Sequence, residues 1–199
     1  RLARDKEFLA TLKIPAASAE GFLFPDTYKV DRTMDARMIL KTMSDRFQVK
    51  VTGAMIEKAR AQGLGIKDWV TLASIIEKET GRKEELPLVS AVFHNRLRIK
   101  MPLQCDPTVI YVIENFDGNL TRRHLERQNP YNSYLNRGLP PGPICNPGMD
   151  ALTATLNPAS VPYFYFVSRN DGSHQFSATL AEHSRAVRKY QILRKSSGN

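Results

Sequence analysis

The chain has few of the residues that support metal or disulfide chemistry. Its 199 residues include two cysteines, Cys105 and Cys145, and four histidines. These are too few and too far apart for a zinc site of recognised spacing. The two cysteines can form one disulfide in an oxidising compartment or remain free thiols. We therefore expect no bound metal and leave the cysteine pairing open.

Long hydrophobic runs and nucleotide-binding motifs are also absent. No segment approaches the ~18 uninterrupted apolar residues that a membrane span needs, and no signal peptide is recognisable. No Gly-rich phosphate loop and no G-x-S-x-G elbow occur, which argues against nucleotide chemistry and a serine hydrolase. Because the chain begins at Arg1 rather than at a methionine, we expect a fragment, so the lack of a targeting segment here says little about location.

The composition is that of a soluble globular protein with an anionic partner. Hydrophobic residues make up 42% and charged residues 25%, which suits one core plus a small appendage. A net charge of +9 favours nucleic acid, an acidic membrane surface or a carboxylate-rich cell wall. The densest basic cluster, on an expected C-terminal helix, comprises Arg185, Arg188, Lys189, Arg194 and Lys195. This helix also carries apolar residues, and no nucleic-acid motif is present, so we expect no nucleic-acid partner.

The apolar spacing predicts an α+β fold that is mainly helical, with one small β-hairpin. Expected helices lie near residues 8–12, 35–47, 54–62, 68–80, 89–97, 106–111 and 147–156, and from residue 179 onward, where Thr179 and Glu182 form a capping box. Expected strands are 163–167 and 174–176, joined by a turn at 170–172. The Pro- and Gly-rich residues 128–148 are typical of a binding loop or a linker, and their tyrosines and amides favour binding.

One helix carries the most informative acid, Glu77. Trp69, Leu72, Ala73 and Ile76 form an apolar stripe, and Glu77 follows Ala73 by four residues, at the edge of that stripe. A carboxyl group partly removed from water has a raised pKa, as a general acid near neutral pH requires. From the helix pattern alone, an ordinary Glu in water remains the alternative.

Acids, amides and aromatic residues together favour a carbohydrate ligand. Sugars offer hydroxyl groups to amides and carboxylates and C–H faces to rings, and cleavage of a glycosidic bond needs a proton at the leaving oxygen. The candidates are Glu20, Glu77, Glu79, Asn95, Gln104, Asp106, Tyr111, Tyr131, Asn132 and Tyr134.

The order and spelling of eight motifs are more specific. They are the segments beginning at Glu20 (EGFLFPDTY), Leu72 (LASIIEKET), Val92 (VFHNRL), Leu103 (LQCDPTV), Tyr131 (YNSY), Gly138 (GLPPGPI), Asn146 (NPG) and Tyr163 (YFYFV). Together they resemble the endolytic murein transglycosylase family, known as MltG or YceG-like. The resemblance covers nearly the whole chain from about Glu20.

The resemblance implies a lytic transglycosylase that cuts nascent peptidoglycan glycan strands internally and uses no cofactor. It implies a single-pass protein of the bacterial inner membrane with its catalytic domain in the periplasm, held by an anchor absent from this chain, near peptidoglycan synthases. Residues 1–33 would be the remnant of a LysM-like module, and residues 34–199 the catalytic domain.

By position, the resemblance implies that Glu77 is the catalytic acid. It would protonate the oxygen between N-acetylmuramic acid and N-acetylglucosamine, then accept a proton as the muramic C6 hydroxyl closes a 1,6-anhydro ring. No second carboxylate is then needed. We expect Asn95, Gln104 and Asp106 to orient the sugar or the acid, and Tyr131, Asn132 and Tyr134 to line the glycan groove. Glu20 either faces the groove or caps the turn at Gly21.

The remaining titratable groups are expected to be structural. Glu79 points about 200° around the helix from Glu77 and is expected to make a structural contact. His94 and His174 are expected to belong to the hydrogen-bonding scaffold, and neither cysteine is expected to be catalytic.

Three alternatives to this function remain. The first is a glycan-binding module without catalysis. The second is a muramidase-type hydrolase in which Asp106 or Glu79 activates water. The third is a pyridoxal-phosphate lyase, which the absence of a phosphate-binding loop beside any lysine argues against.

Overall fold

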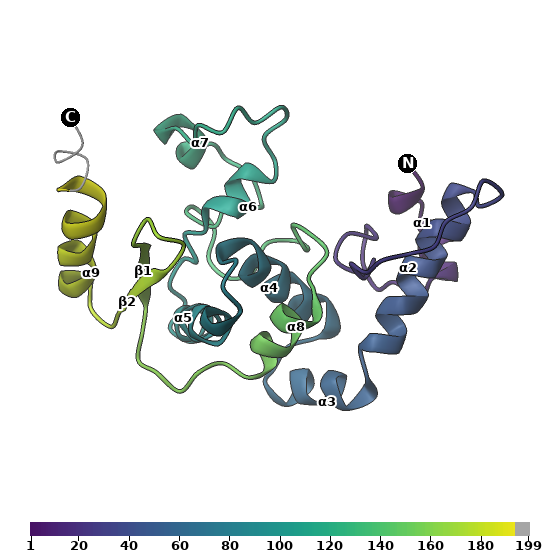
Figure 1. Ribbon diagram of the computed structural model, residues 1–199, viewed down its shortest axis with the longest axis horizontal. Coiled ribbons are helices and arrows are strands. Elements are labelled where there is room, and N and C mark those ends of the chain that lie inside the picture. The colour runs from purple at the N-terminus through teal and green to yellow at the C-terminus, as the bar shows by residue number, and fades with distance from the viewer. Residues whose placement is uncertain (194–199) are drawn as a thin grey trace. The chain divides into compact units, whose positions relative to one another are not determined.

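The computed structural model describes residues 1–193 and divides into two compact units (Figure 1). The first unit comprises residues 1–77 and 139–156, and the second comprises residues 78–138 and the chain from residue 157. Arg194 and Lys195 of the basic cluster lie outside the described residues. The chain thus enters, leaves and re-enters the first unit.

The first unit is helical. It contains the 3-10 turn η1 (Leu2–Arg4), α1 (Lys6–Thr11), α2 (Ala36–Lys50), α3 (Gly53–Ala61), most of α4 (Ile66–Glu79) and α8 (Met149–Leu156). Three of these helices begin at a side-chain cap, in which Asp5, Asp35 and Thr52 accept a hydrogen bond from the amide three residues later. Local sequence therefore fixes where these helices start.

The core of the first unit surrounds α4. Residues 69–76 are buried one after another, and the Trp69 indole donates to the Leu152 carbonyl at 3.0 Å. Phe22 and Phe47 add an edge-to-face ring pair to this core. Residues 1–33 pack in the same unit, while their origin as a LysM-like remnant, with a boundary at residue 33, stays a prediction.

Two loops of the first unit, one at Gly21 and one at residues 143–146, approach each other closely. Gly21 has a left-handed φ of +88°, and its amide donates to Asn146 Oδ1 at 2.7 Å. A Cβ atom at this position would lie 2.4 Å from Cγ of Pro143. The proline-rich segment is therefore tied to the core near residues 143–146, where we had predicted a binding loop or a linker.

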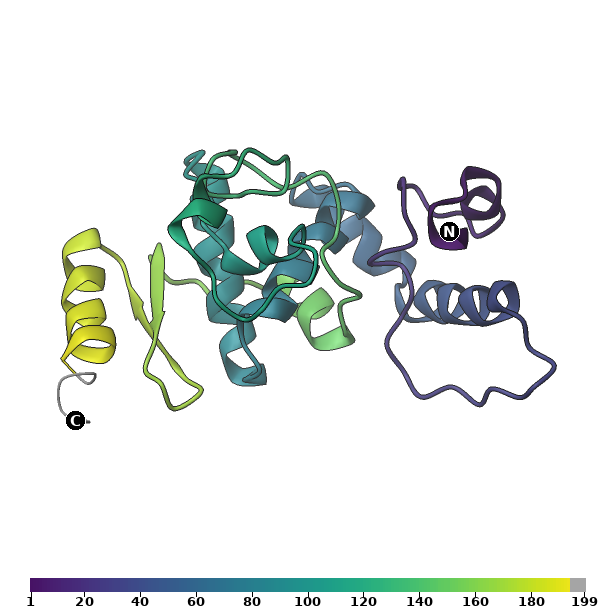
Figure 2. The same cartoon turned by 90° about the horizontal axis from the view of Figure 1, so that it is seen from above.

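The second unit combines short helices with one hairpin. It contains the end of α4, η2 (Lys83–Glu85), α5 (Leu86–Arg98), α6 (Asp106–Ile110), α7 (Arg122–Glu126), β1 (Tyr165–Ser168), β2 (His174–Ser177), α9 (Leu180–Val187) and the π-helical turn η3 (Arg188–Ile192). β1 and β2 are antiparallel, with Phe166 opposite Phe176. Helix α9 lies beside this hairpin in both views (Figures 1 and 2).

The predicted fold class is confirmed, because the protein is mainly helical with one small antiparallel sheet. The Thr179–Glu182 capping box is also confirmed. The helix expected from residue 68 begins two residues earlier, at Ile66, and the helix expected at residues 106–111 begins at Asp106. A difference of two residues is within the usual uncertainty of helix ends.

Two further predictions concern the cysteines and the membrane. Cys105 and Cys145 are both free thiols, so the structure contains no disulfide between them. Within residues 1–193, none of the helices combines the length and the apolar character needed to cross a membrane.

The contact at Gly21 gives a stability prediction. Replacing Gly21 with Ala should lower the free energy of unfolding by about 2 kcal/mol or more, because the residue needs a positive φ and the new methyl group would collide with Pro143. Gly53→Ala is the matched control, since nothing lies within 4 Å of its Cβ position and it begins α3. Urea denaturation of both variants measures the difference; equal stabilities would contradict the packing described.

Candidate functional site

Glu77 lies on the surface of the protein, contrary to expectation. The residue is exposed, and its Oε2 accepts a hydrogen bond from the Gly148 amide at 3.1 Å. Gly148 directly precedes α8, so the carboxylate lies at the positive end of that helix dipole. The premise that Glu77 is partly removed from water was therefore wrong, and its observed contact is structural.

The physical reason lies in the burial of α4. The stripe argument assumed that one face of the helix is exposed, but every residue from Trp69 to Ile76 is buried. Such a helix has no polar face, so its apolar residues do not form a stripe with an edge. Which acid lies close to the core depends instead on where the helix ends.

Glu79, the last residue of α4, has the environment that had been expected for Glu77. It is half-buried, and its Oε1 accepts a hydrogen bond from the Cys105 thiol at 2.7 Å. Burial raises the pKa of Glu79 to about 7, and the nearby charge of Asp106 acts in the same direction. The Cys105 hydrogen bond and the positive charges of His174 and Arg96 oppose this rise. Glu79 can therefore hold a proton near neutral pH.

Glu79 lines a cavity of about 390 Å³ that belongs entirely to the second unit. Besides Glu79, the cavity is lined by Arg96, Leu103, Gln104, Asp106, Tyr134, Tyr165, Phe166, Leu180 and His183. Three predicted site residues, Gln104, Asp106 and Tyr134, thus meet around one carboxyl group.

The extended segment before α6 presents polar side chains to this cavity. Leu103 and Cys105 are buried, whereas Gln104 and Asp106 between and after them are exposed. Gln104 has a positive φ of +48°, which is uncommon for a residue with a side chain. The backbone amide of Gln104 donates to the Ser133 carbonyl at 3.0 Å, which holds the backbone in this conformation.

A buried polar cluster joins this segment to the loop at residues 131–134. The Ser133 hydroxyl accepts from the Cys105 amide at 2.9 Å and lies 2.8 Å from the Thr108 hydroxyl. Beside the cluster, the Tyr134 hydroxyl donates to Asp106 Oδ1 at 2.5 Å. Burial and the charge of Asp106 raise the pKa of Tyr134, so this phenol remains a donor. The carboxylate of Asp106 is thereby oriented.

Arg96 supplies a buried positive charge to the same cavity. Only 6% of the residue is exposed, and its guanidinium donates to the carbonyl groups of Phe164 and Leu103, at 2.6 Å each. The guanidinium carbon lies 5.4 Å from the centroid of the Tyr165 ring. Arg96 therefore fixes the cavity wall while stabilising nearby negative charge.

Other predicted binding residues have structural contacts. Asn132 is 1% exposed, and its amide donates to the Leu125 and Arg127 carbonyls, so it shapes the loop. The Asn95 amide donates to the carbonyls of Val161 and Tyr163, both at 2.9 Å. Both side-chain amides thus bind backbone carbonyls, and neither residue lines the cavity around Glu79, so the orienting role of Asn95 and the groove role of Asn132 stay predictions.

Tyr131 and Glu20 do not lie among the residues that line this cavity. The Tyr131 ring packs against Tyr111 with 4.9 Å between centroids. Glu20 belongs to the first unit, where the neighbouring Gly21 amide donates to Asn146 Oδ1. A role of either residue in binding stays a prediction.

His174 has the scaffold role that was predicted. Its Nδ1 lies 2.6 Å from Glu85 Oε2, and its amide donates to Glu85 Oε1 at 2.9 Å. The hydrogen bonds from His174 lower the pKa of Glu85 against the effect of burial. This pair ties the start of β2 to the turn before α5.

Three of the cavity residues had not been expected in the substrate site. Glu79 was a candidate that we expected to make only a structural contact, although it follows the buried Ile75 and Ile76 by four and three residues and so lies beside them on the helix. Arg96 and Tyr165 lie within the recognised motifs, but nothing in the sequence distinguishes a buried Arg from an exposed one.

A carboxyl group with a pKa of about 7, in a cavity with an amide, a phenol and aromatic walls, defines the general class: a site suited to acid catalysis on a carbohydrate. The chain belongs to the YceG-like family, which it matches over residues 2–189.

Named relatives and a solved structure are similar to the chain. A Bacillus subtilis protein named endolytic murein transglycosylase is 38% identical over 86% of this chain and 48% of its own length. A Streptococcus pneumoniae protein of the same name is 29% identical over 84% of this chain and 31% of its own. The crystal structure of a YceG-like protein from Listeria monocytogenes has a TM-score of 0.83 and 33% identity, covering 92% of this chain and 64% of that one. The chain thus spans about half the length of the first relative, or less for the second.

The protonation of Glu79 predicts how stability depends on pH. In the unfolded chain Glu ionises near pH 4.3, whereas folding raises its pKa to about 7, so this group destabilises the fold as pH rises through that range. Glu79→Gln should raise the free energy of unfolding by roughly 3 to 4 kcal/mol at pH 8, at about 1.4 kcal/mol for each pKa unit, and by much less at pH 4. Urea denaturation at both pH values measures this difference. A gain in stability that is the same at both pH values would contradict the raised pKa of Glu79.

Proposed function

We propose that the protein is a lytic transglycosylase that cleaves peptidoglycan glycan strands, with Glu79 as its catalytic acid and base. The observation that carries the proposal is a carboxyl group with a pKa of about 7 in a cavity lined by Gln104, Asp106 and Tyr134. The names of the similar proteins support the reaction, and general acid catalysis needs such a pKa. The assignment moves the role from Glu77, the predicted acid, to Glu79.

The proposed reaction needs one carboxyl group in two protonation states. Protonated Glu79 gives its proton to the oxygen between N-acetylmuramic acid and N-acetylglucosamine, and the bond from the muramic C1 to that oxygen breaks. The resulting carboxylate then accepts the proton of the muramic C6 hydroxyl as that oxygen bonds to C1. A 1,6-anhydro ring forms, the acid is restored, and no water is consumed.

The neighbouring groups have distinct roles in this proposal. Gln104 offers both a donor and an acceptor to sugar hydroxyl or acetamido groups. Tyr165 gives the sugar ring an aromatic face. The fixed charge of Arg96 stabilises Glu79 as a carboxylate in the second half of the reaction, and Tyr134 keeps Asp106 in place.

A muramidase-type hydrolase remains the second candidate, because Asp106 lines the same cavity as Glu79. We had expected the catalytic acid to have no second carboxylate nearby. Two carboxylates in one cavity are the usual equipment of a glycosidase, in which one of them activates water or attacks the sugar. The hydrogen bond from Tyr134 favours an orienting role for Asp106 instead.

The location and partners proposed for the protein come from the family resemblance. We place the catalytic domain in the periplasm, tethered to the inner membrane by a single-pass anchor outside this chain and close to peptidoglycan synthases. The net charge of +9 suits a carboxylate-rich cell wall and an acidic membrane surface.

Two isosteric variants of neighbouring acids test the assignment. Glu79→Gln should lower the release of anhydro-muropeptides from purified peptidoglycan about 100-fold or more, because the amide cannot donate or accept the proton. Glu77→Gln should retain activity close to that of the wild type, since its side-chain oxygen still accepts from Gly148. Mass spectrometry of the released products measures both.

Each of the other outcomes would favour a different function or a different catalytic residue. Loss of activity in Glu77→Gln with retention in Glu79→Gln would restore the original assignment. Products heavier by one water would identify a hydrolase. Equal release by wild type and both variants would contradict the catalytic role of either acid, and no release by the wild type would leave only a glycan-binding module.

The Cys105 thiol should control the pH range of activity. Its hydrogen bond stabilises the carboxylate form of Glu79, so Cys105→Ala should raise the pKa of Glu79 and move the fall in kcat/KM to higher pH by up to about one unit. Cys105→Ser retains a donor and should leave the profile nearly unchanged. Identical profiles for Ala and Ser would contradict this role.

A further inference from the structure

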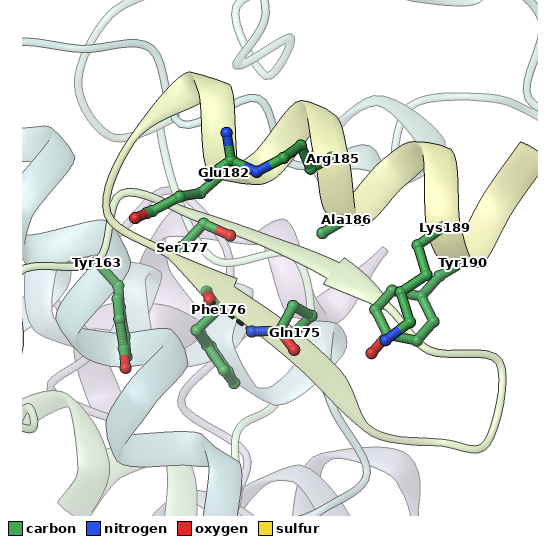
Figure 3. A pocket seen from close by; sticks show the side chains of 9 residues that line it. All are labelled: Tyr163, Gln175, Phe176, Ser177, Glu182, Arg185, Ala186, Lys189 and Tyr190. Atoms are coloured by element: carbon green, nitrogen blue, oxygen red, sulfur yellow. Dashed lines mark hydrogen bonds between the residues drawn. The ribbon is translucent and has the colours of Figure 1, made fainter.

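A second cavity lies outside the proposed catalytic site. It has a volume of about 420 Å³ and lies between strand β2 and the helical segment α9–η3, within the second unit (Figure 3). Its lining residues are Tyr163, Gln175, Phe176, Ser177, Glu182, Arg185, Ala186, Lys189 and Tyr190. None of them lines the cavity that contains Glu79.

The segment α9–η3 separates the two cavities. Leu180 and His183 line the catalytic cavity, whereas Arg185 and Lys189 line the second one. Arg185 and Lys189 are four residues apart and share one face of the segment, as helical spacing predicts. A ligand in the second cavity therefore lies one helix away from a glycan strand in the first.

Small residues create the second cavity and aromatic residues wall it. Ala186 and Ser177 are 8% and 4% exposed, and Figure 3 shows these short side chains between longer ones. On the strand side, the Tyr163 and Phe176 rings are stacked with 5.9 Å between centroids. Such walls suit methyl groups and flat amide groups.

The charges of the second cavity favour an anion. Arg185 and Lys189 are exposed, and within residues 1–193 neither forms an ion pair with a carboxylate. The ammonium group of Lys189 lies 5.0 Å from the Tyr190 ring centroid, which holds it at the rim. The one acid, Glu182, is committed to capping α9 through the amides of Ala178 and Thr179. Two cations thus face one capped carboxylate.

We propose that the second cavity binds the acidic stem peptide of the glycan strand. Such a peptide, attached to the lactyl group of muramic acid, has free carboxylates for Arg185 and Lys189 and alanine methyl groups for the Tyr163–Phe176 wall. A glycan stripped of its peptides by an amidase keeps only the lactyl carboxylate on each muramic acid and lacks the alanine methyl groups and the other carboxylates of the peptide. The inference rests on the proposed function for the identity of the substrate, and it assigns the recognition of peptides to a surface separate from Glu79.

Neighbouring cations on η3 provide a matched pair of variants. Lys189 lines the cavity, whereas the adjacent and equally charged Arg188 is exposed and does not line it. The probe is the stem peptide released from purified peptidoglycan by an amidase, titrated into the protein and followed by NMR. We expect saturable binding that Lys189→Gln weakens about fivefold and Arg188→Gln leaves unchanged. Binding should also weaken as salt is added.

Two results of the titration would overturn the inference. One is the absence of saturable binding by the wild type, and the other is an equal loss in both variants, which would indicate diffuse attraction to the basic helix. Both substitutions replace exposed side chains, so both variants should fold. This is checked by the NMR signals of residues away from the substitution, which should stay unchanged. Glycan strands stripped of peptides keep one lactyl carboxylate per muramic acid, so they should compete at least about fivefold more weakly than the peptide. Competition as strong as that of the peptide would assign the cavity to the glycan and overturn the inference.

Peptide binding is measured without catalysis, so failure of the peptide-site proposal can be distinguished from failure of the proposed reaction. Wild-type protein that binds the peptide but releases no anhydro-muropeptides would retain the second site and reject the first. A matching assay compares cleavage of peptide-bearing and stripped strands. Lys189→Gln should raise KM about fivefold for the former only, with kcat unchanged.

Discussion

The removal of the Glu79 carboxyl group from water is the interaction on which the rest of the site depends. Helix α4 is buried on all sides from Trp69 to Ile76 and ends within the second unit, so its last acid is half-buried when the helix stops. Desolvation makes the neutral acid stable near pH 7, and the fixed charge of Arg96 limits this effect. The same group can then donate and later accept a proton. The cost is a fold that is less stable above neutral pH, as is common at functional sites.

The positions of most helices and of the hairpin could be predicted because they depend on local signals. The caps at Asp35 and Thr179 and the hairpin turn at residues 170–172 act over a few residues, and a single sequence contains them. The division into two units could not be predicted, since it depends on the chain leaving the first unit and returning to it at residue 139. Such long-range packing leaves no periodic signal.

The candidate site around Glu79 could be predicted only in part, because it too depends on packing between segments that are distant in the sequence. Gln104, Asp106 and Tyr134 were all predicted from their motifs as residues that contact the sugar or the acid, and they line one cavity, while their roles stay predictions. The proposed function gives Glu79 the role predicted for Glu77, because residues 69–76 of α4 are buried all round rather than along one apolar stripe. Asn132 was assigned to the groove because an amide can bind either a sugar or a carbonyl, and only the structure shows that it binds two carbonyls.

The titration of the Glu79 carboxyl group tests the central claim most directly. Carbon-13 NMR of protein labelled at the glutamate side-chain carboxyl follows every Glu as pH is varied, and the spectrum of Glu79→Gln identifies the resonance. The account predicts one carboxyl that titrates near pH 7 and is missing from the variant. If the Glu79 resonance instead titrated below about pH 5, as an ordinary Glu does, the claim would be wrong.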